Sequence, residues 1–126
     1  MLPAAARLTR SADFRLVTRQ GRRAGGPRIV VHALVPVGSS ERIGASPRVG
    51  LVVSKAVGNS VIRHRVSRRL RHVVADRLGT LPPGSSLIVR ALPSAAEASS
   101  AEFRQDFDAA LRRLRLTANN DGGVVL

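Results

Sequence analysis

The sequence predicts a single domain of the α/β class, more closely α+β, with the order helix, two or three strands, helix, strand, helix. Two features of the chain lead to this prediction. Short runs rich in β-branched residues, at 28–35, 48–54 and 86–91, are interleaved with segments whose apolar residues recur at helical spacing. The length of 126 residues suffices for one modest core and is too short for two.

The first helix is predicted at about 12–20. Ser11 stands where an N-cap would be, and Gly21 follows as a residue that can adopt the left-handed conformation of a helix stop. Phe14 and Val17 fall on one side of this helix. We therefore expect it to pack against a sheet.

The strands follow a basic connector at 21–27, which has room for a very short edge strand, and a Gly/Ser/Pro-rich loop at 36–47 separates the first two. Alternate residues of the three predicted strands form one fully apolar face: Ile29, Val31, Ala33, Val49, Leu51, Val53, Leu87, Val89 and Ala91. The other face mixes apolar residues with four basic ones: Arg28, His32, Arg48 and Arg90. One side of the sheet should therefore be buried.

The basic residues of the second face have two open interpretations. They could border a cleft that has the sheet as its floor and the first helix as its wall, which would suit a single strand of nucleic acid. They could equally lie at strand ends and simply reach solvent.

The central helix is predicted at 60–78, with Asn59 as its cap and Gly79 as its stop. Its buried arc should consist of Ile62, Val66, Leu70, Val73, Val74 and Leu78. Its opposite arc should consist of His64, Arg65, Arg68, Arg69, Arg71 and His72. Arg63 projects within the apolar arc, in the first turn, so it either reaches the rim between helix and cleft or extends along its own stem to water.

A rigid turn at 81–84 returns the chain to the third strand, and a capping box formed by Ser99 and Glu102 predicts a last helix ending at about Leu116. The core spacing of this helix comprises Phe103, Phe107, Ala110, Leu111 and Leu114. Residues 1–116 are expected to form the domain. Residues 117–126 are turn-rich and are expected to form a flexible C-terminal tail.

The charge of the chain points to a polyanionic partner. The net charge is +13, and residues 55–72 contain one lysine, five arginines and two histidines without any carboxylate. Wound as a helix, this segment keeps an apolar stripe, so its charge belongs to a folded surface. A fixed cationic surface without counter-charges predicts binding to nucleic acid.

The composition also excludes several kinds of site. The chain has no cysteine, which removes disulfides, thiolate zinc sites and cysteine nucleophiles and fits a reducing cytoplasm. No secretory signal or run of about 18 apolar residues is present, so we expect a soluble, cytoplasmic protein. Among eight carboxylates, only Glu102 and Asp106 resemble a metal-binding pair, and we interpret them as solvated partners of a helix dipole. Any chemistry that this protein serves should be located on another molecule.

Residues 55–71 read KAVGNSVIRHRVSRRLR and resemble the RNR signature of the bacterial ribonuclease P protein component. The frame K-x-x-G-N-x-V-x-R at a strand-to-helix joint is far more specific than a basic run. The resemblance extends to SADF at 11–14, to RVGLVVSK at 48–55 and to the final strand and helix. It covers about residues 7–116.

The resemblance implies a single-domain αβββαβα sandwich with a central mixed sheet, like that of ribosomal protein S5, and with an unusual left-handed βαβ crossover. It implies that a catalytic RNA removes the 5′ leader of precursor tRNA in a magnesium-dependent endonucleolytic reaction. The protein would then contribute no catalytic residue, the Mg²⁺ would be bound largely by the RNA, and the protein alone would be a monomer with no membrane partner.

The resemblance also implies two binding surfaces, one for each RNA. Residues for the catalytic RNA are Lys55, Gly58, Asn59, Arg63, Arg65, Arg68 and Arg71, to which we add His64 and Arg69 from the same helix. Residues for the leader are Phe14, Val17, Arg28, His32 and Ser54, to which the strand pattern adds Arg48 and Arg90. In the family, the signature helix and its entry loop also help to bind metal ions near the active site.

The sequence departs from the family pattern in both surfaces. His64 stands where the family usually has asparagine and Ser67 where it usually has lysine, which changes hydrogen bonding and removes one charge. Thr18, Ile29 and His32 occupy positions that are often aromatic. Because base stacking contributes about 1–3 kcal/mol per aromatic contact, leader binding should depend more on arginine and on His32.

Other functional classes remain open on the sequence alone. A general RNA-binding or ribosomal-type protein would use the same basic helix without any role in tRNA processing. A DNA architectural protein would need an arm or wedge for the minor groove, which the predicted order of elements does not offer. A protein-only nuclease would cleave RNA without an RNA subunit.

Overall fold

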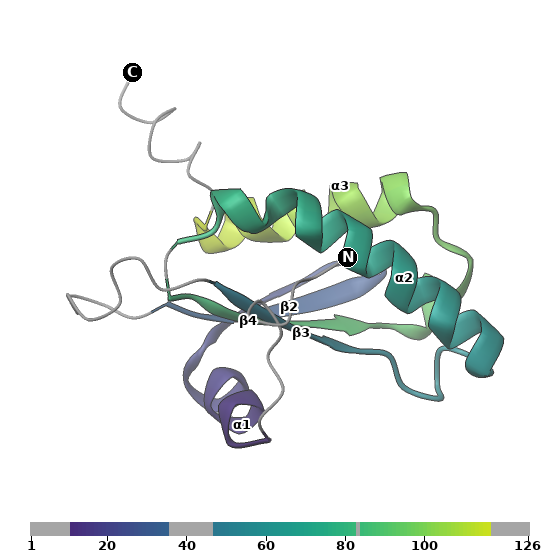
Figure 1. Ribbon diagram of the computed structural model, residues 1–126, viewed down its shortest axis with the longest axis horizontal. Helices are drawn as coiled ribbons and strands as arrows, with labels where there is room; N and C mark the ends of the chain where they lie inside the picture. The colour runs from purple at the N-terminus through teal and green to yellow at the C-terminus, as the bar shows by residue number, and fades with distance from the viewer. Residues whose placement is uncertain (1–10, 36–46, 83, 117–126) are drawn as a thin grey trace.

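The computed structural model describes residues 11–35, 47–82 and 84–116, which form one sheet and three α-helices (Figure 1). The strands are β1 (Arg22–Gly25), β2 (Ile29–Leu34), β3 (Arg48–Val52) and β4 (Ser86–Ala91). The helices are α1 (Ser11–Gln20), α2 (Ser60–Arg77) and α3 (Ser100–Leu114), and the short 3₁₀ helices are η3 (Leu78–Thr80) and η4 (Pro93–Glu97). This confirms the predicted order of elements, including the short edge strand. The predicted loop at 36–47 and the predicted tail lie almost wholly outside the described residues.

The sheet is mixed and has the strand order β1-β2-β4-β3. The pairs β1–β2 and β2–β4 are antiparallel, whereas β3 and β4 are parallel, with Gly50 opposite Ile88. A parallel pair needs a long connection, and α2 provides it. Helices α2 and α3 cover one face of the sheet, and α1 lies on the other (Figure 1).

The predicted apolar face of the sheet is the floor of the main core. Its side chains pack beneath α2 and α3, where Phe103, Phe107 and Leu70 are fully buried. The second face has a much smaller core, in which Val17 of α1 contacts Ile88 of β4. The period-2 alternation therefore predicted the two faces correctly within β2, β3 and β4.

Two of the predicted helix caps are confirmed. The Asn59 side chain accepts a hydrogen bond from the backbone N–H of Ile62 at 3.0 Å, and Ser99 and Glu102 form the predicted capping box. Caps of this kind typically stabilise a helix by about 1 kcal/mol. The bounds differ slightly, because α1 begins with Ser11 as its first helical residue and α2 ends at Arg77.

The two predicted glycine stops are wrong. In the described ranges, positive φ occurs at Gly58, Gly84 and Arg115, and at neither Gly21 nor Gly79. After α2 the chain continues through Gly79 in the 3₁₀ helix η3. Gly21 is needed for a different reason, since a Cβ there would lie 2.4 Å from the carbonyl oxygen of Val17 and 2.5 Å from that of Ala33.

No helix among the described residues has both the length and the apolar character needed to cross a membrane.

Candidate nucleic-acid interface

The entry to α2 is a pair of tight turns between β3 and the helix. The backbone N–H of Val57 donates to the carbonyl of Ser54 at 3.1 Å, and that of Gly58 donates to the carbonyl of Lys55 at 3.2 Å. Val57 is buried and fixes these turns to the core, whereas Ser54 and Lys55 are exposed. The predicted Lys55 cation is thus presented on an anchored loop directly before the helix.

Gly58 and Asn59 shape the joint between this loop and the helix. The φ angle of Gly58 is +157°, and a Cβ on this residue would lie 2.9 Å from Cγ2 of Ile62. Ile62 is also the residue whose N–H the Asn59 side chain caps. Both members of the Gly-Asn pair therefore have a structural role in starting α2, and any RNA contact that they make remains a prediction.

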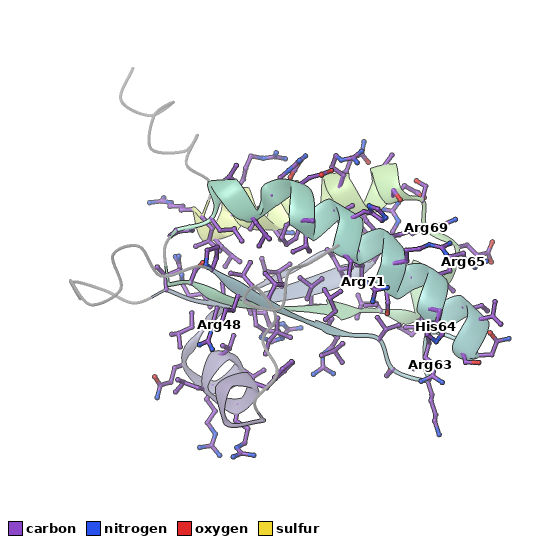
Figure 2. All side chains as sticks on the ribbon, viewed as in Figure 1. Arg48, Arg63, His64, Arg65, Arg69 and Arg71 are labelled. Atoms are coloured by element: carbon purple, nitrogen blue, oxygen red, sulfur yellow. The ribbon has the colours of Figure 1, made fainter. Side chains whose placement is uncertain are left out.

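The basic residues of α2 occupy three positions around the helix, as 100° per residue requires. The buried side consists of Val66, Leu70, Val73 and Val74. The exposed crest opposite it consists of His64, Arg68 and His72. The half-buried cations lie on the two flanks: Arg65 and Arg69 on one, Arg63 and Arg71 on the other (Figure 2). The structure thus brings the predicted RNA-binding cations together on one helix.

Arg65 and Arg69, which the sequence places on the arc opposite the core, each contact another segment of the protein. The Arg65 guanidinium donates to the carbonyl of Ala96 at 2.8 Å, and that of Arg69 donates to the carbonyl of Ala98 at 2.6 Å. Both acceptors are neutral, so the two positive charges persist. Sequence periodicity could not reveal these partners, because they lie about thirty residues further along the chain.

Arg63 lies in the first turn of α2, and its place at the rim of a cleft stays a prediction. Its side chain is half-buried, and its Nε is buried without a hydrogen-bond partner among the described residues. Figure 2 shows it at the N-terminal end of α2, near His64. The stem is therefore packed against protein.

Four carboxylates of the described residues form ion pairs with arginines outside this surface: Asp76, Glu102, Asp106 and Asp108. Asp108 binds Arg77 at 2.7 Å, and Asp76 lies 3.8 Å from Arg104. The hydrogen bond that Arg77 donates to Asp108 is the main cause that raises the pKa of Arg77. No ion pair within the described ranges involves Lys55 or the arginines at 63–71. The N-terminal half of α2 is therefore a cationic surface whose arginines form no ion pair with the described carboxylates.

Arg28 does not line the same surface as His32, and its predicted place there is wrong. Its guanidinium donates to both carboxylate oxygens of Asp106, at 2.9 and 3.0 Å, and to Glu102 at 2.9 Å. Both acceptors belong to α3, which packs on the face of the sheet opposite α1. The interpretation of Glu102 and Asp106 as solvated dipole partners is wrong as well, because Asp106 is buried and both hold Arg28.

The pKa of Glu102 is lowered, first because its carboxylate accepts the backbone N–H of Ser99 and then because Arg28 is close. Both interactions favour the charged carboxylate. The pair is thus occupied in holding α3 to the start of β2. The ligand of this pair is a guanidinium and not a metal ion.

The sheet face beside α1 carries the remaining predicted leader residues. His32 and Phe14 are half-buried and Arg90 is exposed, whereas Val17 is only 1% exposed and belongs to the small core. Val17 therefore supports the surface from below and is not available to contact a bound strand.

Arg23 on the edge strand was missed by the sequence analysis. It is exposed, and it lies opposite His32 in the β1–β2 pairing. The pairing of Arg23 with His32 depends on β1, a strand of four residues whose position the sequence predicted only approximately. The alternation of Arg23 with the buried Ala24 is the signal that could have placed it.

Arg48 is the first residue of β3, and Ser54 lies two residues beyond its end at Val52. Arg48 begins β3 near α1, clearly separated in Figure 2 from the labelled residues of α2. Six residues of extended chain span roughly 20 Å. The two residues therefore cannot contact the same phosphate.

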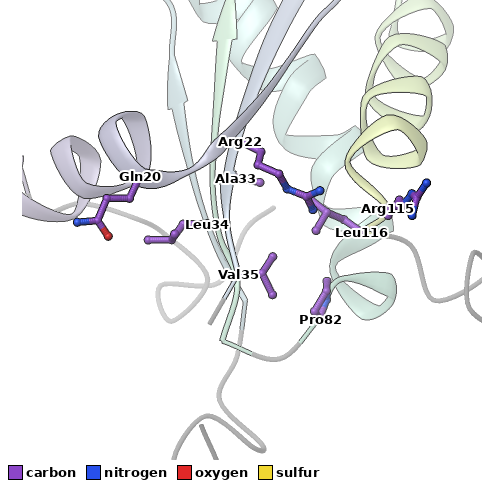
Figure 3. A pocket seen from close by; sticks show the side chains of 8 residues that line it. All are labelled: Gln20, Arg22, Ala33, Leu34, Val35, Pro82, Arg115 and Leu116. Carbon is purple, nitrogen blue, oxygen red and sulfur yellow. The ribbon is translucent and has the colours of Figure 1, made fainter. Parts of the chain in front are cut away.

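A hollow of about 330 Å³ lies where α1, the sheet and the end of α3 meet (Figure 3). Its walls are mostly aliphatic: Gln20, Arg22, Ala33, Leu34, Val35, Pro82, Arg115 and Leu116. The guanidinium of Arg22 donates to the carbonyl of Leu114 at 2.6 Å. None of the predicted site residues lines this hollow.

The residues present do not form a metal-binding set on the protein. Within 11–35, 47–82 and 84–116, no three His, Cys, Asp or Glu side chains come together as ligands for an ion.

Comparisons with known proteins agree with this architecture. A ribonuclease P protein component from Streptomyces bikiniensis is 52% identical over 117 residues, which cover 90% of this chain and 95% of that protein. One from Mycobacterium sp. (strain KMS) is 50% identical over 115 residues, covering 91% and 94%.

Solved structures share the fold at much lower sequence identity. The RNase P protein of Staphylococcus aureus superposes with a TM-score of 0.76 at 21% identity, covering 90% of this chain and 98% of that one. The RNase P protein of Thermotoga maritima superposes with a TM-score of 0.67 at 21% identity, covering 86% and 94%. The family described as Ribonuclease P matches residues 2–115. With half of its residues identical to curated members over nine-tenths of its length, the chain belongs to the ribonuclease P protein component family.

Proposed function

We propose that this chain binds the catalytic RNA of ribonuclease P through the N-terminal half of α2 and its entry loop, and binds the 5′ leader of precursor tRNA on the sheet face beside α1. Membership of the family makes it a component of a tRNA-processing ribonucleoprotein. The observation that carries the proposal is the cationic surface of α2, whose charges have no carboxylate partner among the described residues. Such a surface is stabilised by phosphates.

In this proposal the hydrolysis of the leader is performed by the RNA subunit with Mg²⁺ bound largely by that RNA. The protein acts by placing two sets of cations between two RNA molecules that repel each other. Neutralising phosphates of both RNAs lowers this repulsion, so less Mg²⁺ is needed to hold the precursor in place.

The leader surface would combine cations with very little stacking. Of the three Phe residues, Phe103 and Phe107 are fully buried, so only Phe14 is placed to contact a base. The sheet face beside α1 carries the cations Arg23, His32, Arg48 and Arg90. We therefore propose that the leader is held mainly through its phosphates, with little preference for sequence.

The test of this function is reconstitution with the ribonuclease P RNA at low magnesium concentration. Cleavage of precursor tRNA at the 5′ end of the mature tRNA is expected with the protein and RNA together, and much less with RNA alone. Equal binding to bulk RNA and no gain in cleavage would favour a general RNA-binding protein instead. Cleavage by the purified protein without RNA would contradict the proposal that the RNA subunit performs the hydrolysis.

The affinity for the catalytic RNA should depend steeply on salt. If about six phosphates are neutralised, log K is expected to fall with log salt at a slope of roughly −4 to −5. The slope can be measured by filter binding across a salt series. A slope shallower than about −2 would show that the cations of α2 do not carry the binding.

Leader binding should strengthen as the pH falls, because of His32. Its pKa is lowered from 6.5, first by burial and then by the positive charges of Arg23 and Arg90. In the free protein, protonation of His32 therefore opposes folding, and stability declines as the pH falls below about 6.5. A bound phosphate offsets both arginine charges and raises this pKa again, so binding takes up a proton.

The expected result is tighter binding of a single-stranded RNA at about pH 6 than at about pH 8, by at most roughly tenfold for each unit by which the pKa rises. Fluorescence anisotropy with a labelled oligonucleotide measures it. His32→Gln should bind with an affinity that changes little over the same range. If the affinity of the wild type depended on pH in the same way as that of His32→Gln, the RNA would be bound away from His32.

A further inference from the structure

The segment of residues 93–98, which joins β4 to α3, is held rigidly against the protein. The N–H of Leu92 donates to the carbonyl of Arg28 at 2.8 Å, and the hydroxyl of Ser94 donates to that of Pro27 at 2.6 Å. Ala95 and Ala98 are buried, at 0% and 3% exposed. The backbone carbonyls of this segment are therefore fixed in position.

Two of these fixed carbonyls are the acceptors for cations of α2. Arg65 donates to Ala96 and Arg69 donates to Ala98, at 2.8 and 2.6 Å, from adjacent turns of the helix. A guanidinium has five N–H donors, and each arginine uses one of its terminal nitrogens here. The charge is not cancelled, because a carbonyl carries none, and donors remain for a second acceptor.

An arginine held in this way loses its rotamer freedom when the protein folds. An unrestrained arginine on the surface loses the same freedom only when it binds a phosphate, and this loss weakens binding. Arg68 and Arg71 of the same helix are of the second kind, because no hydrogen bond or ion pair of their side chains occurs among the described residues. The surface thus contains restrained and unrestrained cations side by side.

We propose that residues 93–98 are a positioning segment for RNA binding: their carbonyls orient the guanidiniums of Arg65 and Arg69 toward phosphate before the RNA arrives. The proposal rests on the function proposed above. It adds a second element, remote from the signature in sequence, to the machinery that binds the catalytic RNA.

Replacing arginine by lysine tests the orientation while keeping the charge. Lysine carries a compact ammonium group that cannot hold a carbonyl and a phosphate in the planar fork of a guanidinium. Arg65→Lys/Arg69→Lys is expected to lower the affinity for the ribonuclease P RNA about tenfold with an unchanged salt slope. The matched control Arg68→Lys/Arg71→Lys, which affects unrestrained cations, should lower it by less than about threefold.

A second variant loosens the segment and leaves every charge in place. Pro93→Gly/Ala96→Gly gives the backbone more freedom next to the Ala96 carbonyl. It is expected to lower the affinity about fivefold in the wild-type background and to add little when Arg65 and Arg69 are already lysine, because coupled sites are not additive. Circular dichroism and thermal unfolding identify a temperature at which all variants are folded.

The affinities of the two double variants and of their combination decide whether residues 93–98 position the arginines or have a purely structural role. If the folded Pro93→Gly/Ala96→Gly variant binds the RNA as tightly as the wild type, the segment does not position the arginines. The same conclusion follows if this variant lowers the affinity by the same factor in the Arg65→Lys/Arg69→Lys background as in the wild type. Failure of the proposed function would look different, because the unchanged protein would then show no preference for this RNA over bulk RNA.

Discussion

Replacing Lys55, Arg68 and Arg71 together by alanine is expected to weaken binding to the ribonuclease P RNA about 100-fold near 0.15 M salt. Each cation that meets a phosphate contributes about one unit to the salt slope, so the slope should become shallower by roughly 2 to 3. The three side chains form no hydrogen bond or ion pair among the described residues. Removing them therefore leaves no buried group unpaired, and the fold should be retained.

The matched control removes the same charge elsewhere on the protein. Arg19, Arg104 and Arg112 lie on α1 and α3, and the triple alanine variant has the same net charge as the first one. Its affinity should fall far less, and its salt slope should change by less than about one unit. If both triple variants lost the same affinity, binding would depend on net charge and the surface of α2 would not be the site.

The strands and caps could be predicted because their signals are local. An alternating strand such as β2 assigns each side chain to a face whatever its neighbours are, and an Asn or Ser cap acts within three residues. Both faces of the sheet, the small core at Val17 and the helix starts at Asn59 and Ser99 follow from such signals.

The contacts of several arginines could not be predicted in the same way. A helical wheel places Arg65 and Arg69 on a polar arc but cannot show that a carbonyl from another segment meets them there. The strand alternation predicted Arg28 on the same face as His32. Arg28 lies just outside β2, however, and its side chain binds Asp106, which is 78 residues further along the chain. In the same way, the contact that requires Gly21 involves Ala33 and exists only once β1 pairs with β2. Each of these features depends on tertiary packing.

The corrected place of Arg28 leads to the second large effect, which concerns stability. Asp106→Ala is expected to lower the free energy of unfolding by about 2–3 kcal/mol. The Asp106 side chain is 7% exposed and that of Arg28 is 25% exposed, so the substitution leaves a poorly solvated guanidinium with only Glu102 as its partner. The partial exposure of Arg28 is why the expected loss lies below that of a fully buried pair. Urea unfolding followed by circular dichroism measures it.

Three further variants separate this contribution from RNA binding. Glu102→Gln should destabilise the protein less than Asp106→Ala, because the Glu102 side chain is 42% exposed. In Arg28→Met/Asp106→Leu both charges are replaced by apolar groups of similar size, and much of the lost stability should return. If the role of Arg28 is to hold α3 to the start of β2, Arg28→Met should lower the stability of the protein. The assembled complex should still bind precursor tRNA as the wild type does. A selective loss of precursor binding in a protein of unchanged stability would instead show that Arg28 belongs to the leader-binding surface.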